Sequence, residues 1–201
     1  MLVKHAGGII KDRWALPGGF VAYNEDVDKA ASRLLHDLTG VENLYLEQLK
    51  AFGNVERYPT KRVITIAYFA LTRPEEYKLL PGFTASDVKW FDIYSIPDLP
   101  YDHEEILRFG WNRLKRKVKY EPIGFNLLPQ KFTLFQLQEL YEAILEIKVD
   151  KPNFRRKIMK MGLLLKCDEK QMGVSHRAAS MYRFDQKIYR QLREEGFIFE
   201  F

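Results

Sequence analysis

Residues 19–41 read GFVAYNEDVDKAASRLLHDLTGV, and their spacing indicates more about the architecture than any other segment. Glu25 follows Gly19 after five intervening residues, and Arg33 follows Glu25 after seven more. Apolar residues then recur every three or four positions, which predicts a helix over 26–38. The inward face of this helix comprises Val27, Ala30, Ala31, Leu34, Leu35 and Leu38.

This spacing resembles that of a Nudix box, the signature of enzymes that hydrolyse nucleoside-diphosphate derivatives with the help of divalent cations. At the three positions where the box carries metal-binding glutamates, the chain has Leu34, Asp37 and Leu38. Magnesium prefers oxygen ligands in a near-octahedral shell, and leucine offers none. The resemblance therefore implies a retained scaffold without hydrolytic activity, metal or other cofactor, in which Glu25 and Arg33 form a structural ion pair.

The composition allows one large domain or two small ones. With 201 residues, of which 46% are hydrophobic, the chain can bury a sizeable interior. No apolar run reaches the roughly 18 residues of a membrane span, and the start does not resemble a signal peptide. The single cysteine, Cys167, excludes an internal disulfide and a multi-cysteine zinc site. These features predict a cytoplasmic protein with no membrane partner.

Positive charge is concentrated towards the C-terminal end. Residues 148–193 contain 13 Lys and Arg against four Asp and Glu, a net charge of +9, whereas the whole chain carries +5. The rest of the chain is therefore net acidic. This asymmetry favours a basic C-terminal module that binds an anionic partner, and a solvated charged face is the alternative.

The N-terminal part alternates short apolar runs with helices. Apolar spacing predicts a second helix over 103–119, which Glu121-Pro122 ends because proline lacks an amide donor. We therefore predict two domains, 1–120 and 121–201. Short apolar runs lie at 2–4 and 9–10, and the strands expected in the first domain are 44–52, 63–71 and 89–91.

The C-terminal part has the element order of a winged helix. Thr133 and Gln136 have capping-box spacing, which predicts the start of one helix. Asp150-Lys151-Pro152 predicts the start of the next, which ends at Met161. Around these helices we expect a short extended segment at 123–128 and two wing strands at 163–167 and 178–184.

The helix expected over 151–161 has two distinct faces. Phe154, Ile158 and Met161 form a stripe suited to burial. The other face is basic, and a helix fits the major groove, where arginine pairs with guanine, asparagine pairs with adenine and lysine neutralises phosphate. The residues predicted to contact DNA, two of them at the wing tip, are Lys151, Asn153, Arg155, Arg156, Lys157, Lys160, His176 and Arg177. An ordinary amphipathic helix with a solvated face is the alternative.

Four segments of this part resemble the Nudix-related transcriptional regulators. They are PIGFNLLP at 122–129, FTLFQLQELYEAI at 132–144, DKPNFRRK at 150–157 and AASMYRF at 178–184. The resemblance implies an α+β chain, in which a Nudix α/β/α sandwich with a mixed sheet precedes a winged helix-turn-helix domain. A Nudix fold usually begins with a strand ahead of a segment like 2–4, and we expect either that the start is displaced or that this strand is missing from this sequence.

The same resemblance implies a function. We expect a repressor that binds double-stranded operator DNA as a homodimer through its winged helix and responds to a small effector bound by its Nudix domain. The likeness is greatest to a Bacteroidetes-type branch that includes arabinose-responsive repressors, whereas other branches sense ADP-ribose.

A Nudix fold would place Trp14, Arg57, Tyr58 and Arg62 in the effector pocket or on its rim. Trp14 could stack on a sugar or an adenine, and an arginine could bind a phosphate. Core packing of Trp14 and solvated arginines are the alternatives. Without metal-binding glutamates a diphosphate would lack neutralisation, which favours a neutral pentose such as L-arabinose. The two arginines keep ADP-ribose as the second candidate.

Two other functions stay open. An active hydrolase would need different carboxylates for its metal, such as Glu25, Asp37 and Glu56. An RNA-binding or scaffold protein would use the same basic charge on another partner. Asp102 and His103 are expected to cap the second helix rather than to catalyse a reaction.

Overall fold

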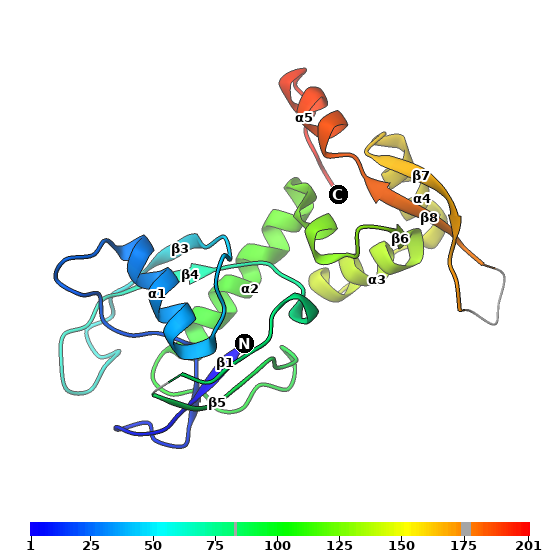
Figure 1. Ribbon diagram of the computed structural model, residues 1–201. Helices are drawn as coiled ribbons and strands as arrows, with labels where there is room; N and C mark the ends of the chain where they lie inside the picture. Colours follow the sequence, from blue (N-terminus) through cyan, green and yellow to red (C-terminus); the bar gives the residue numbers. More distant parts are fainter. Residues whose placement is uncertain (83, 174–177) are drawn as a thin grey trace. The chain divides into compact units, whose positions relative to one another are not determined.

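The computed structural model describes residues 1–82, 84–173 and 178–201 (Figure 1). They form two compact units, Met1–Trp111 and Asn112–Phe201. The division falls inside helix α2 (His103–Tyr120), so one continuous helix contributes residues to both units. In the described part of the chain, no helix is long and apolar enough to cross a membrane.

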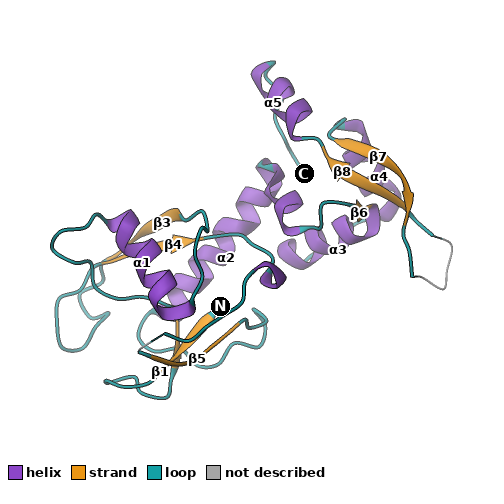
Figure 2. Cartoon of the chain, viewed as in Figure 1, coloured by secondary structure: helices purple, strands orange, loops and turns teal. Residues whose placement is uncertain are grey.

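The first unit contains two antiparallel sheets (Figure 2). Its strands are β1 (Leu2–His5), β2 (Trp14–Ala15), β3 (Glu47–Phe52), β4 (Thr65–Phe69) and β5 (Ala85–Lys89), with a 3-10 turn, η1, at Pro74–Glu76. In the three-stranded sheet, β1 lies between β2 and β5, and Val3 is opposite both Ala15 and Val88. The strands β3 and β4 pair separately.

Helix α1 (Val27–Thr39) confirms the helix predicted from the spacing of the box. Asp26 caps its start, because the carboxylate accepts a hydrogen bond from the backbone of Lys29 at 2.8 Å. Gly40 ends it at φ 72°, in the left-handed region that glycine adopts without strain. Leu38 packs into a core cluster with residues of β1 and β5, which places α1 against the three-stranded sheet.

A second cluster joins β3 and β4 to the start of α2. Phe52 and Ala67 from these strands are buried with Ile106 of α2. Phe109, one turn further along the helix, meets Phe52 edge-to-face with ring centroids 5.9 Å apart. Lys50 lies over both rings, with its Nζ 4.5 Å and 4.3 Å from their centroids. This packing fixes the first turns of α2 in the first unit.

The second unit confirms the predicted order of helix, helix and two-stranded wing. After the last turns of α2 come η2 (a 3-10 helix, Pro122–Leu127), β6 (Phe132–Thr133), α3 (Leu134–Leu145), α4 (Lys151–Lys160), β7 (Leu164–Lys170), β8 (Ser180–Phe184) and α5 (Gln186–Glu194). The strand β8 lies between β6 and β7, and both pairings are antiparallel.

Aromatic side chains dominate the core of the second unit. Phe132 and Tyr141 are almost fully buried. Phe125 of η2 stacks on Phe184 of β8 with centroids 4.5 Å apart. Phe154 of α4 is also buried and meets Tyr141 of α3 edge-to-face at 6.1 Å. The two helices of the helix-turn-helix are therefore oriented through contacts between rings.

Two short segments differ from the sequence predictions, and the apolar run at 9–10 forms a turn. The strand expected at 89–91 covers Ala85–Lys89 instead, because β1 pairs along this earlier stretch. Residues 123–128, expected to be extended, lie mostly in the 3-10 helix η2. This helix brings Gly124 so close to the Tyr141 ring that an added Cβ would lie 3.2 Å from it.

The capping box at the start of α3 gives a test of the second unit. Thr133 Oγ1 accepts from Gln136 N at 3.2 Å, and Gln136 Oε1 accepts from Thr133 N at 2.8 Å. We predict that Thr133→Ala lowers the free energy of unfolding by about 1 kcal/mol in urea denaturation, because a helix amide loses its acceptor. Thr133→Ser keeps the hydroxyl and is the control. An equal loss of unfolding free energy in both variants would show that the methyl group, and not the capping hydroxyl, stabilises the domain.

Candidate functional site

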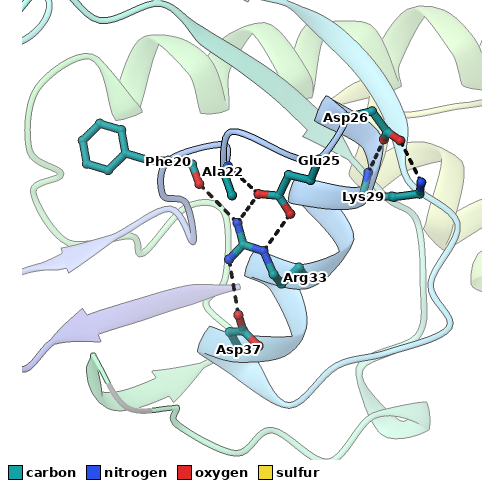
Figure 3. Close-up of polar contacts among 7 residues, drawn as sticks. All are labelled: Phe20, Ala22, Glu25, Asp26, Lys29, Arg33 and Asp37. Carbon is teal, nitrogen blue, oxygen red and sulfur yellow. Dashed lines mark hydrogen bonds and ion pairs between the residues drawn. The ribbon is translucent and has the colours of Figure 1, made fainter.

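The loop between β2 and α1, called the box loop here, is held against α1 by one guanidinium group, that of Arg33 (Figure 3). Its Nε and Nη2 donate to the two carboxylate oxygens of Glu25 at 2.9 and 2.5 Å. Nη2 also donates to the carbonyl of Phe20 at 3.2 Å, and Nη1 donates to Asp37 at 3.4 Å. The backbone amide of Ala22 adds a further hydrogen bond to Glu25 at 2.6 Å. The predicted ion pair between Glu25 and Arg33 is confirmed.

These bonds stabilise the charged form of both partners. The hydrogen bonds from Arg33, followed by that from the Ala22 backbone, lower the pKa of Glu25 to about 2. The same contact raises the pKa of Arg33 above its usual range. The side chain of Glu25 is only 13% exposed, whereas that of Arg33 is 39% exposed, so the carboxylate is the shielded partner of the pair. Bidentate arginine–carboxylate pairing also fixes both groups in direction. These contacts hold the loop against α1.

Leu34 and Leu38, two of the three residues that the sequence comparison with a Nudix box placed at expected metal-ligand positions, are packed apolar side chains. Leu34 lies against Gly19, where an added Cβ would be 2.6 Å from Leu34 Cδ2. Leu38 is buried in the core beneath α1. Asp37 offers a carboxylate, which already pairs with Arg33. Among the described residues, no three His, Cys, Asp or Glu side chains lie close enough to hold a metal ion.

The fixed box loop carries two aromatic side chains that sequence reasoning did not select. Phe20 and Tyr23 are strongly exposed, although aromatic residues usually lose much of their surface on folding. Either ring could stack on a base or a sugar. Periodicity could not identify them, because they precede the helix that gives the box its pattern.

Trp14, a predicted effector residue, lies in a small aromatic cluster. Its ring meets Phe91 edge-to-face with centroids 4.9 Å apart, and Lys89 Nζ lies 5.4 Å from the Trp14 ring. The side chain is half-buried, so part of the ring remains available for a ligand. This position is compatible with both interpretations made from the sequence, stacking on a ligand and packing in the core.

The predicted effector arginines already have protein partners. Arg57 is buried and donates from Nε and Nη2 to both carboxylate oxygens of Asp102, each at 2.7 Å. Arg62 donates from Nη1 to the carbonyls of Gly53 and Asn54 at 2.9 and 3.1 Å. Tyr58, the fourth predicted residue, packs on Tyr101 at 5.0 Å. A surface hollow of about 420 Å³ adjoins Arg57 and is lined by Asn54, Glu56, Arg57, Pro59, Tyr101, Asp102 and Glu105.

His103 joins the start of α2 to the loop that leads into the box. Its Nδ1 accepts from the backbone amide of Leu16 at 3.1 Å, across 87 positions of sequence. Burial lowers the pKa of His103 to about 4, which keeps the ring neutral and able to accept. Asp102 accepts a hydrogen bond from Arg57. Asp102 and His103 therefore both make long-range contacts, which their position at the start of α2 did not indicate.

The predicted DNA-binding side chains of α4 all point away from the core. Phe154 and Ile158 are 4% and 1% exposed, whereas the polar residues between and around them are exposed. The exposed side chains are Lys151, Asn153, Arg155, Arg156, Lys157 and Lys160. Arg156 donates from Nη2 to Oδ1 of Asn153, so these two lie side by side. His176 and Arg177, predicted at the wing tip, lie outside the described residues.

Two protein families match the chain. The NUDIX domain family matches residues 1–109, and the NrtR DNA-binding winged helix domain family matches residues 124–184. The chain belongs to the NrtR-type Nudix regulators. The order of the two domains is that predicted from the sequence.

Individual relatives share this architecture. The chain is 33% identical to the ADPR responsive transcriptional repressor NtrR of Acinetobacter baylyi, over 94% of this chain and 76% of that protein. Shewanella oneidensis NrtR complexed with a 27mer DNA matches with a TM-score of 0.73 and 28% identity, over 92% of this chain and 85% of that one. The NUDIX domain of Shewanella oneidensis NrtR complexed with ADP ribose matches with a TM-score of 0.50 and 31% identity, over 56% and 75% of the two chains.

The pH dependence of stability tests the pair in the NrtR-type box. The pKa of Glu25 falls from an ordinary 4.5 to about 2 on folding, so the unfolded chain takes up this proton first. The stability that the pair contributes is therefore complete above about pH 4.5 and is lost as the pH falls towards 2. We predict that Glu25→Gln lowers the Tm at pH 7 and flattens its fall across this interval. The control in calorimetry is Glu42→Gln, at an exposed position. If the Tm of Glu25→Gln falls with pH in parallel with that of the parent protein, the Glu25–Arg33 pair is not the source of this pH dependence.

Proposed function

We propose that this NrtR-type protein is a repressor that binds operator DNA through α4 and releases it when an ADP-ribose-type effector binds the Nudix domain. The main support for DNA binding is that α4 has a buried apolar stripe on one side and six exposed polar or basic side chains on the other. A helix of this kind fits the major groove. The similarity to an NrtR complexed with a 27mer DNA supports the same assignment.

Asn153 and Arg156 are the proposed base-reading pair. Asn153 is in the first turn of α4, the end of a recognition helix that usually contacts base edges, and Arg156 lies three residues further along the helix. The hydrogen bond between them engages Nη2 of the arginine and Oδ1 of the asparagine. Opening it on binding would free both groups for bidentate contacts, arginine with guanine and asparagine with adenine. Lys157 and Lys160 would neutralise phosphates.

A homodimer would present two such helices to two half-sites. The half-sites of helix-turn-helix dimers lie about one helical turn, roughly 34 Å, apart. Two modest interfaces then add their binding energies. A change in dimer geometry would also give the effector a way to weaken DNA binding.

A double substitution tests the recognition helix. We predict that Arg156→Ala with Lys157→Ala weakens binding to a duplex from the upstream region of its own gene by at least about a hundredfold at fixed salt, because one base contact and one phosphate contact are lost. The slope of log affinity against log salt should fall by about 1 to 2.

The matched control removes the same amount of charge elsewhere in the unit. Lys187→Ala with Arg190→Ala takes two exposed positive charges from α5. It should change affinity by less than about threefold, since it alters only the long-range field. Equal losses in the two double variants, measured by gel shift or anisotropy, would reject α4 as the reading element.

The proposed effector class is ADP-ribose rather than the free pentose favoured by the sequence. The Acinetobacter baylyi relative is named as ADPR responsive, and the Shewanella oneidensis NUDIX domain was complexed with ADP ribose. The exposed rings of Phe20 and Tyr23 and the half-buried ring of Trp14 offer surfaces for an adenine or a ribose. Arg62 donates through Nη1 to its carbonyl partners, and its other nitrogens are the proposed phosphate donors.

We further propose that the Nudix domain senses its ligand without cleaving it. Two of the three metal-ligand positions are packed leucines, and the carboxylate of Asp37 is paired with Arg33. Cleavage of a diphosphate depends on metal neutralisation of its charge and activation of water. A ligand held without metal would persist, which suits a sensor.

A thermal-shift series separates the two effector classes. We predict that millimolar ADP-ribose raises the Tm of the full chain by several degrees and that L-arabinose does not, because selective binding to the folded state raises apparent stability. Arg62→Ala should reduce the shift, whereas Lys61→Ala, at the adjacent exposed position, should preserve it. A rise in Tm with L-arabinose and none with ADP-ribose would identify the pentose as the effector, and would leave the proposal of DNA binding unaffected.

A further inference from the structure

Residues 185–201 lie beyond the segment that matches the winged-helix family. They form α5 and a C-terminal tail, which we define as residues 197–201. Gly196, at φ 89°, turns the chain back after α5 in a conformation that suits glycine. Figure 1 shows the tail returning from α5 towards the end of α2.

The tail is packed into the core of the winged helix. Phe199 is only 2% exposed. The backbone amide of Phe201 donates to the carbonyl of Lys119, in the last turn of α2, at 2.8 Å. The ring of Phe201 lies 4.0 Å from that of Tyr141 in α3 and 5.5 Å from that of Phe154 in α4, measured between centroids. Together with the contact between Tyr141 and Phe154, these three rings form one cluster that joins the tail to α3 and α4, and the backbone hydrogen bond to Lys119 joins the tail to α2.

The same ring also touches the polar side of α4. Lys157 Nζ lies 5.8 Å from the centroid of Phe201, within the range of a cation–π contact. Phe154 and Lys157 are one turn apart, so Phe201 contacts a buried residue and a proposed phosphate-binding residue of one helix. It therefore limits both the rotation of α4 and the direction of the Lys157 side chain.

The recognition helix needs such support because it is short. It has 10 residues, and helices of fewer than about 12 residues are marginal in water without tertiary packing. Phe154 and Ile158 are its buried residues. Tyr141, whose ring contacts Phe154 of α4, has a buried hydroxyl with no hydrogen-bond partner within the described residues. Ring contacts, including that of Phe201, therefore hold this side chain.

We propose that Phe201 is a positioning residue for DNA binding, which fixes α4 against α3 and the end of α2 and directs Lys157 towards the phosphate backbone. The inference rests on the proposed DNA-binding function. It assigns a role in that function to a segment outside the matched winged helix.

The experiment compares Phe201→Leu with Ile198→Ala in the full chain. Leucine fills much of the volume of the ring and so preserves the fold, but it removes the aromatic and cation–π contacts. Ile198 is in the same tail and is 78% exposed, so its truncation is the matched control. Two quantities are measured: amide hydrogen exchange along α4, and affinity at one salt concentration for the upstream duplex and for an unrelated duplex of equal length.

For Phe201→Leu we expect about tenfold faster exchange in α4, the scale of one or two lost ring contacts, with unchanged exchange in α1. Affinity for the upstream duplex should fall about tenfold. Affinity for the unrelated duplex should change by less than about twofold, since non-specific binding follows total charge. Ile198→Ala should behave as the parent protein in every measurement.

Unchanged exchange in α4, or equal weakening on both duplexes, would overturn the positioning role. A parent protein that distinguishes the two duplexes, with Phe201→Leu equal to it, would overturn this inference and leave the proposed function standing. A parent protein that does not distinguish them would overturn the proposed function itself.

Discussion

The Nudix domain depends on the hydrogen bonds of one side chain, Arg33. Its guanidinium reaches the carboxylates of Glu25 and Asp37 and the carbonyl of Phe20, and so ties a loop to the helix that follows it. In a catalytic box, metal ions add further links among the carboxylates. Here Leu34 closes on the loop instead. A loop fixed in advance by protein groups loses little entropy when a ligand binds, which is an advantage for a sensor.

In the winged helix, aromatic packing fixes the orientation of α4. A recognition helix must be short enough to enter a groove and must still hold its side chains in one direction. In α4 the direction comes from Phe154, which is seated against Tyr141 of α3 and Phe201 of the tail. Helix α2 supplies residues to a core in each unit, Ile106 in one and Val118 in the other.

Local chemistry could be predicted from the sequence, and long-range pairing could not. The starts of α3 and α4 follow from Thr133 and Asp150, because a cap is decided within four residues. The pairing of Arg57 with Asp102 joins residues 45 positions apart, and nothing in the local pattern of either indicates it. The contact of Phe201 with α3 and α4 is of the same kind. The polar face of α4 was therefore predictable as a surface, whereas the protein partners of Arg57 and Arg62, two proposed effector residues, were not.

The central proposal is that ligand binding in a non-cleaving Nudix domain controls DNA binding by the winged helix. The most direct test follows the anisotropy of a labelled upstream duplex bound to the full chain while ADP-ribose is added with magnesium present, and then analyses the nucleotide by chromatography. We predict saturable release of the duplex with ADP-ribose recovered intact. We also predict that saturating DNA weakens ADP-ribose binding by the same factor. Magnesium-dependent formation of AMP, or a duplex that stays bound at saturating ADP-ribose, would contradict it.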